Sequence, residues 1–451
     1  MLHSDVKALL SRIHAKLGDL WWYTILLFVA QRFGDVINMF VGLWIVPKYV
    51  PMEELGAVLP LTNVVGVIGI PLSIVAIPFL KFVAVMMEKG EVGKAKAFVR
   101  DTFVATGVFS ILSVLVACFV LPFFFERLRV QNGSLAFLLV VITVLTAVSN
   151  VSMNAVSALR RFSAIVWLSA IAAPLRLVLV IVLMPFRALT GYLAGGLSAP
   201  LVNIGGAFLA IRGFLCSSVR PEPYLREYGR TMLVYAWPLV LMTVVNVLGG
   251  NVDTLVIRHR LSEFESAGYY MITRFSDISI QFASAFMAFV FPMLANRDGH
   301  DDEMRRMVVH SASGVLGIGL LLAVVLWIVG KPLLSLTAEW SRYVSLVPEM
   351  GGFAIVGALT MACTCITTAF VARSMFSFLW YFLPIGIAKC MFLYALTGYG
   401  FFRGVLPDEW ISAVEAFNPC RLSVVLWVLI VTNLMTLLCL LRQAFARRES
   451  A

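Results

Sequence analysis

The feature that most constrains this chain is a series of long, uninterrupted apolar segments. Many of them exceed about 18 residues, the length at which a helix can cross the hydrocarbon core of a bilayer. They do not alternate between apolar and polar residues, as the strands of an outer-membrane barrel do. The sequence therefore predicts an all-α polytopic membrane protein.

Composition agrees with this interpretation. The 451 residues are 61% hydrophobic and only 13% charged, whereas soluble domains carry about 25% charged residues. The net charge of +10 lies mostly at the ends of the apolar segments. Basic residues in that position set membrane orientation. We therefore expect membrane lipids, and no nucleic acid, among the partners of this chain.

The apolar segments predict about twelve transmembrane helices. The second and eighth are long and contain prolines, so we expect bends there. The predicted spans are residues 22–47, 55–87, 102–124, 135–157, 163–185, 190–212, 232–257, 267–294, 308–330, 346–370, 375–398 and 421–442.

Basic residues predict the orientation of these spans. Segments on the N-terminal side of the membrane hold about twice as many Lys and Arg as segments on the other side, which places that side in the cytoplasm. Residues 1–20 resemble a short amphipathic helix on the cytoplasmic surface, and 443–451 form a cytoplasmic tail. We expect a multi-pass protein of the bacterial inner (plasma) membrane.

The chain also repeats itself. Glu53-Glu54-Leu55-Gly56 opens the second span, and Glu265-Ser266-Ala267-Gly268 opens the eighth. Further on, Arg160, Trp167 and Arg176 recur at nearly the same offset as Arg373, Trp380 and Lys389. Because each half holds six spans, these matches predict two parallel six-helix bundles around a central cavity, related by a pseudo-two-fold axis along the membrane normal. The bundles are 21–212 and 232–442, with a cytoplasmic linker at 213–231.

Ionisable side chains inside the spans are the candidate functional residues, because each costs a few kcal/mol to insert. Six form the predicted substrate-binding set that lines the cavity, and two are secondary candidates nearer the ends of their spans. The first group is Arg32, Asp35, Arg176, Arg274, Asp277 and Lys389, and the second is Lys81 and Asp253.

Two interpretations stay open for the pairs Arg32 with Asp35 and Arg274 with Asp277. Residues three apart on a helix can pair, so each pair either neutralises itself and helps helices dock or lines a hydrated cavity. Arg176 and Lys389 have no acid on their own helix, which favours the cavity. Basic residues outnumber acidic ones among these candidates.

Motifs of membrane enzymes are missing from the sequence. No P-loop, histidine cluster or HExxH pattern is present, so we expect no catalytic residue, metal or cofactor and interpret the chain as a transporter. Pro238, within the seventh span, is a candidate hinge. Coupling to a proton or a sodium gradient is left open by the sequence.

The sequence also resembles a known family. Two stretches are similar to Wzx-type polysaccharide flippases of the multidrug/oligosaccharidyl-lipid/polysaccharide exporter superfamily. The first is Leu55 to Arg100, LGAVLPLTNVVGVIGIPLSIVAIPFLKFVAVMMEKGEVGKAKAFVR. The second runs from Val252-Asp253-Thr254-Leu255 through LSEFESAGYY to Arg274.

The resemblance implies alternating access by two bundles, with the first, second, seventh and eighth helices facing the cavity. It implies a polyprenyl-diphosphate-linked oligosaccharide as substrate, moved from the cytoplasmic to the periplasmic face for cell-surface polysaccharide biosynthesis, and other polysaccharide assembly proteins as partners. Cationic side chains suit a diphosphate. The alternatives are a drug/cation antiporter of the same superfamily and a non-transporting scaffold of a polysaccharide assembly complex.

Overall fold

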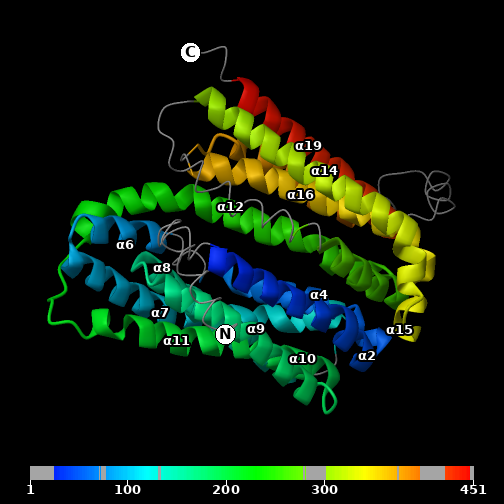
Figure 1. Ribbon diagram of the computed structural model, residues 1–451, viewed down its shortest axis with the longest axis horizontal. Helices are drawn as coiled ribbons and strands as arrows, with labels where there is room; N and C mark the ends of the chain where they lie inside the picture. The colour runs from blue at the N-terminus through cyan, green and yellow to red at the C-terminus, as the bar shows by residue number, and fades with distance from the viewer. Residues whose placement is uncertain are drawn as a thin grey trace, which may run out of the picture. The chain divides into compact units, whose positions relative to one another are not determined.

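In the computed structural model, all regular secondary structure among the described residues is helical (Figure 1). These residues are 25–70, 72, 78–128, 130, 134–277, 280, 301–372, 375–396 and 422–446. Ten of the helical segments in this part of the chain are long and apolar enough to cross a membrane. In a bilayer a helix satisfies all its backbone hydrogen bonds internally, which is why these apolar runs are helical. The predicted all-α polytopic fold is confirmed.

The first half of the chain contains short and long helices. Residues 25–40 are helical and lead into a π-helical segment, η1 (Val41–Ile45). The helices that follow are α2 (Val46–Tyr49), α3 (Met52–Leu55), α4 (Val58–Ile68), α6 (Phe79–Glu88), α7 (Val92–Leu128), α8 (Ser134–Ala158), α9 (Phe162–Leu183), α10 (Ala188–Gly196) and α11 (Ser198–Leu215).

The second half begins with α12 (Leu225–Arg260), and residues 263–277 are also helical. The remaining elements are α14 (Asp301–Leu334), α15 (Ala338–Ser341), η2 (Val344–Leu346), α16 (Val347–Ala372), α17 (Leu379–Leu396) and α19 (Leu422–Ala446). The predicted helix at 1–20, most of the predicted bend in the second span and the end of the eighth span lie outside the described residues.

Three long helices begin earlier than the apolar pattern predicts. α7 begins at Val92, α12 at Leu225 and α14 at Asp301, before the apolar starts at 102, 232 and 308. The added turns carry charges such as Arg226 and Glu227. A helix can continue into water without losing its internal hydrogen bonds, so hydropathy locates the lipid-embedded part and not the helix end. Part of the predicted linker 213–231 is therefore helical.

Two compact units make up the chain. Unit 1 comprises residues 1–41, 71–113 and 141–233, and unit 2 comprises 42–70, 114–140 and 234–451. In unit 1, α9 packs against α10 and α11. In unit 2, α16 packs against both α14 and α19, and the three helices run side by side in Figure 1. The predicted division into bundles at 21–212 and 232–442 stays a prediction.

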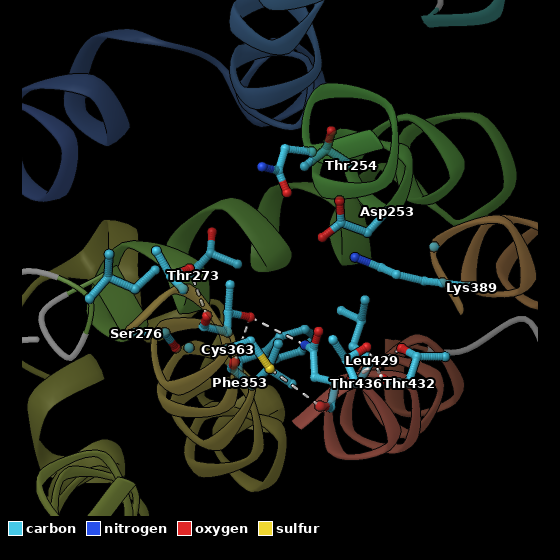
Figure 2. A pocket seen from close by; sticks show the side chains of 18 of the residues that line it. Asp253, Thr254, Thr273, Ser276, Phe353, Cys363, Lys389, Leu429, Thr432 and Thr436 are labelled. Atoms are coloured by element: carbon cyan, nitrogen blue, oxygen red, sulfur yellow. Dashed lines mark hydrogen bonds between the residues drawn. The ribbon is translucent and has the colours of Figure 1, made fainter. Parts of the chain in front are cut away.

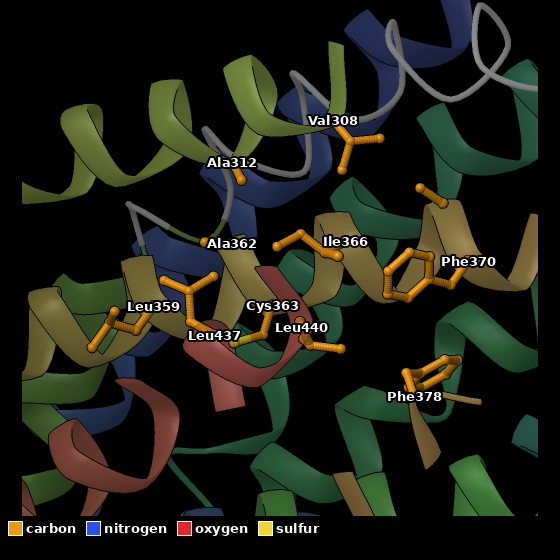
Figure 3. Close-up of a cluster of buried hydrophobic side chains, with 11 residues drawn as sticks. Val308, Ala312, Leu359, Ala362, Cys363, Ile366, Phe370, Phe378, Leu437 and Leu440 are labelled. Carbon is orange, nitrogen blue, oxygen red and sulfur yellow. The ribbon is translucent and has the colours of Figure 1, made fainter. Parts of the chain in front are cut away.

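Unit 2 has a buried apolar core between α14, α16 and α19 (Figure 3). It includes Ile366 and Ala362 of α16, neither of which has any exposed surface. Small residues bring these helices close together: a Cβ added to Gly319 of α14 would collide with the Cβ of Ala358 on α16. Close approach of small residues is a main source of helix association in membranes.

Candidate functional site

Unit 2 contains a cavity of about 440 Å³. Its walls come from α4, α12, the helical residues 263–277, α16, α17 and α19. Small-molecule sites in proteins usually enclose about 300–1,000 Å³, so the cavity can hold one small ligand or part of a larger one. Three of the predicted residues line it, namely Asp253, Asp277 and Lys389.

Hydroxyl groups dominate the polar part of this wall (Figure 2). Seven of them donate their hydrogen to a backbone carbonyl three or four residues earlier on the same helix; for example, Thr364 Oγ1 donates to the carbonyl oxygen of Thr360 over 2.9 Å. They are Thr273, Ser276, Thr360, Thr364, Thr367, Thr432 and Thr436. A hydroxyl whose hydrogen is used in this way retains oxygen lone pairs, so it presents an acceptor.

Asp253 of α12 is a buried carboxylate, 8% exposed. The hydroxyl of Tyr269 donates to its Oδ2 atom, whereas its buried Oδ1 atom has no hydrogen-bond partner among the described residues. Figure 2 shows the amino group of Lys389, from α17, pointing toward this carboxylate. The tertiary structure therefore brings Lys389 an acid from another helix, although its own helix carries none.

Arg274 and Asp277 form the ion pair that their spacing permits. Arg274 NH1 lies 3.1 Å from Asp277 Oδ2, and the guanidinium carbon lies 5.1 Å from the ring centroid of Tyr270. Asp277 also lines the cavity. This pair thus combines the two interpretations that the sequence leaves open, because it neutralises itself and still contributes to the wall.

Unit 1 contains the corresponding pair in the first span. Arg32 NH2 lies 3.0 Å from Asp35 Oδ2, and the two side chains are 27% and 31% exposed. The guanidinium carbon of Arg32 lies 5.5 Å from the ring centroid of Phe28. The two side chains therefore bind each other and remain partly exposed.

Arg176 lies well inside α9 of unit 1 and is bound by neutral groups. Its NH1 group donates to Asn38 Oδ1 over 2.9 Å, and its NH2 group donates to the hydroxyl of Tyr192 over 3.2 Å. The Tyr192 ring centroid lies 5.5 Å from the guanidinium carbon. Because an amide and a phenol orient a cation without neutralising it, the charge of Arg176 stays available for an anion.

Lys81 and Pro238 complete the predicted set. Lys81 is exposed on α6 of unit 1. Pro238 lies inside α12, a helix that continues unbroken for 36 residues. The roles of all these residues in binding or movement stay predictions.

The predicted site residues divide unequally by charge between the two units. Unit 1 contains three cations and one carboxylate, whereas unit 2 contains two of each. Unit 1 holds Arg32, Asp35, Lys81 and Arg176, and unit 2 holds Asp253, Arg274, Asp277 and Lys389. Among these candidates the excess of basic residues therefore lies in unit 1, and their place in a central cavity stays a prediction.

Sequence reasoning missed the hydroxyl wall of unit 2. Thr360, Thr364 and Thr367 recur at intervals of four and three residues along α16, which places them on one face of a helix. Thr432 and Thr436 do the same on α19. A threonine stripe on an otherwise apolar span was the available signal, and a search limited to ionisable residues does not detect it.

A cluster of polar side chains lies near residue 90 in unit 1. The Tyr228 hydroxyl donates to Glu91 Oε2 over 2.9 Å, and Lys89 Nζ donates to the Tyr228 oxygen over 3.2 Å. Lys94 Nζ bridges Glu91 and Glu227. The hydrogen bond from Tyr228, followed by contacts with Lys94, lowers the pKa of Glu91 below its ordinary value of 4.5. This cluster ties the start of α7 to the start of α12.

Comparison with known proteins gives the fold. No family model and no curated protein matches the sequence. Solved structures do match: an inward-facing multidrug resistance MATE family transporter of the MOP superfamily has a TM-score of 0.66 at 12% identity, covering 95% of this chain and 99% of that chain.

Two further structures agree. An outward-facing MATE transporter of the same superfamily has a TM-score of 0.62 at 12% identity over 97% of this chain and 98% of its own. A Vibrio cholerae MATE transporter has a TM-score of 0.60 at 16% identity over 95% and 97%. The chain thus has the fold of MATE transporters of the MOP superfamily.

Proposed function

We propose that this chain is a transporter of the bacterial inner membrane that moves a polyprenyl-diphosphate-linked oligosaccharide from the cytoplasmic to the periplasmic face. The observation that carries the proposal is the environment of Arg176. A guanidinium inside an apolar helix is held by Asn38 and Tyr192, both neutral. Arg176 is half-buried, and a cation within a membrane span is costly unless water or an anion compensates it; a diphosphate supplies that anion.

The charge of unit 1 supports the same substrate. Unit 1 holds three predicted-site cations, Arg32, Lys81 and Arg176, and a single predicted-site carboxylate, Asp35, which pairs with Arg32. Guanidinium groups bind phosphate oxygens in a bidentate manner, and two phosphates need more than one cation. In this proposal unit 1 binds the diphosphate of the lipid carrier.

The fold supports a mechanism of alternating access. Solved structures with this fold include an inward-facing and an outward-facing transporter. We infer that this chain also alternates between two such states and that no covalent step occurs. Movement of the substrate then follows from differential binding in the two states.

The test is lipid flipping by purified protein in liposomes. Arg176→Gln should reduce flipping of a labelled polyprenyl-diphosphate oligosaccharide roughly tenfold or more, because a charge-assisted contact is lost. Arg176→Lys should retain part of the activity, since the charge survives without the bidentate geometry, and Arg176→Glu should be worst. Arg187→Gln, an exposed residue between α9 and α10, is the matched control and should be unaffected. Wild-type flipping by Arg176→Gln would refute the diphosphate assignment.

Pro238 is proposed as a hinge within α12. If the helix bends there during transport, Pro238→Ala should slow flipping while thermal stability in detergent stays near that of the wild type, because the substitution restores a backbone donor without removing a core contact. A parallel fall in stability and flipping would identify a static kink.

One observation favours a second candidate function, a drug/cation antiporter. Asp253 keeps a buried oxygen that has no donor within the part of the chain that the structure describes, and Asp277 lies in the same cavity wall. Carboxylates in a cavity attract cations. Efflux of a cationic dye from liposomes, driven by a proton or sodium gradient and abolished by Asp253→Asn, would support this candidate over the flippase.

A further inference from the structure

We propose that the cavity of unit 2 is a carbohydrate subsite that accepts a neutral or amino sugar of the transported lipid and rejects acidic sugars. The inference rests on the proposed flippase function and extends it by assigning the sugar to a place and a chemical class. Nothing in the ionisable residues alone points to this site, since the polar part of its wall consists mainly of hydroxyl groups.

The threonine hydroxyls of the wall donate their hydrogens to their own helices. Thr360, Thr364, Thr432 and Thr436 each donate their single hydrogen to a carbonyl of their own helix, over 2.7–2.9 Å. The oxygen lone pairs that remain can only accept, and the oxygen of Thr360 already accepts one hydrogen bond, from the Nδ2 group of the lining residue Asn433 over 3.2 Å. A wall of acceptors matches a ligand that carries several donors, and the hydroxyl groups of a sugar ring are such donors.

The wall of the cavity is accessible to a ligand and partly aromatic. Thr360 and Thr364 are exposed, so their oxygens are within reach of a ligand. Phe353 and Tyr269 also line the cavity, with ring centroids 5.2 Å apart in an edge-to-face arrangement. Sugar rings have an apolar face of C–H groups as well as hydroxyl groups, and an aromatic surface beside acceptors suits both.

The charged side chains of the wall are mainly acidic. Asp253 and Asp277 bring two carboxylates to the wall, and Asp253 Oδ1 has no donor among the described residues. Lys389 is the single cation among the lining residues described, and it points toward Asp253 (Figure 2). The carboxylate of a uronic acid would therefore be repelled by two carboxylates, and the one lysine of the wall already points toward Asp253. A neutral or amino sugar would instead donate hydrogen bonds to the threonine oxygens.

These same features argue against a phosphate group in this cavity. A phosphate brings only acceptors and negative charge, and it needs N–H or guanidinium donors. In unit 2, Arg274 is already paired with Asp277 at 3.1 Å. The cavity of unit 2 is thus assigned to the sugar by the chemistry of its own residues.

The experiment measures binding of three lipids to full-length protein in detergent by native mass spectrometry. They are bare polyprenyl diphosphate, the same lipid with one N-acetylhexosamine, and the same lipid with one uronic acid. We expect the hexosamine to strengthen binding roughly tenfold over the bare lipid and the uronic acid to give no gain, which corresponds to one or two net hydrogen bonds.

The variant Thr360→Val/Thr364→Val removes two acceptors with little change of shape. It should abolish the gain from the hexosamine and leave binding of bare polyprenyl diphosphate unchanged, which also shows that the protein is folded. The control Thr102→Val/Thr106→Val changes buried hydroxyls of α7 in unit 1 and should keep the gain. Asp253→Asn/Asp277→Asn should reduce the discrimination against the uronic acid.

The outcomes separate the two proposals. If bare polyprenyl diphosphate does not bind, the diphosphate function fails. If it binds but the hexosamine adds nothing, or if the double valine variant keeps the gain, the carbohydrate subsite is refuted while the flippase survives. Tighter binding of the uronic acid than of the hexosamine would likewise overturn the subsite.

Discussion

Arg258 of α12 provides the sharpest test of what holds unit 2 together. It is a buried arginine, 3% exposed. Its Nε group donates to the carbonyl oxygen of Leu128 over 3.0 Å, and its NH2 group donates to that of Glu53 over 2.7 Å. Leu128 ends α7 and Glu53 lies in the four-residue helix α3, so both carbonyls belong to helix ends that lack partners of their own. One guanidinium therefore caps two helices.

The change to test is Arg258→Met, which keeps an unbranched apolar stem and removes the guanidinium donors. Two carbonyls then lose a charge-assisted hydrogen bond and stay buried, at about 1–3 kcal/mol each. We expect the free energy of unfolding to fall by about 2–6 kcal/mol. Arg258→Lys should lower the free energy of unfolding by about half as much, because the single ammonium group of lysine can bond one of the two carbonyls more easily than both.

The assay is unfolding in mixed detergent and dodecyl sulfate micelles, followed by circular dichroism. Arg230→Met, on the same helix but exposed, is the matched control and should change the free energy of unfolding by no more than about 0.5 kcal/mol. If Arg258→Met also remains within about 1 kcal/mol of the wild type, the two hydrogen bonds do not stabilise unit 2 and the capping argument is wrong.

Two further predictions concern packing and pH. Gly56→Ala should lower the melting temperature, because its Cβ would lie 2.8 Å from the Cβ of Ser266 and 3.0 Å from that residue's carbonyl carbon, whereas Gly107→Ala has open space and should be neutral or gain up to about 1 kcal/mol. The pKa of Glu91 is lowered by the Tyr228 hydroxyl, so this contact stabilises the fold above the unfolded pKa and is lost as pH falls through the folded one. The advantage of the wild type over Tyr228→Phe in melting temperature should accordingly shrink between about pH 6 and about pH 3; an advantage that grows in acid would contradict the assignment.

Hydropathy identified the membrane-embedded helices well because the bilayer leaves few alternatives to a helix. The ten candidate spans in the described part of the chain each contain a predicted apolar segment or most of one. The same signal could not give the starts of α7, α12 and α14, since their first turns are polar and continue the helix beyond the lipid. It also gave no indication of the π-helical segment Val41–Ile45.

That segment shows what tertiary contacts add. The carbonyl of Gly42 accepts a hydrogen bond from the Tyr270 hydroxyl over 3.1 Å, and that of Leu43 accepts one from Trp340 Nε1 over 2.8 Å. A π-helical turn shifts the internal hydrogen bonds by one residue and frees carbonyls for such partners. The donors lie hundreds of residues away in sequence, so no local pattern could predict them.

The sequence by itself determined the features that depend on local spacing and on transfer to lipid. These are the helices and the ion pairs Arg32–Asp35 and Arg274–Asp277, which lie three residues apart and are both present. Tertiary structure alone decided which groups from different helices meet: Asn38 and Tyr192 at Arg176, and Asp253 near Lys389. The physical reason is that burial energy depends only on how apolar a segment is, whereas the state of a buried charge depends on which partner the fold brings within a few ångströms.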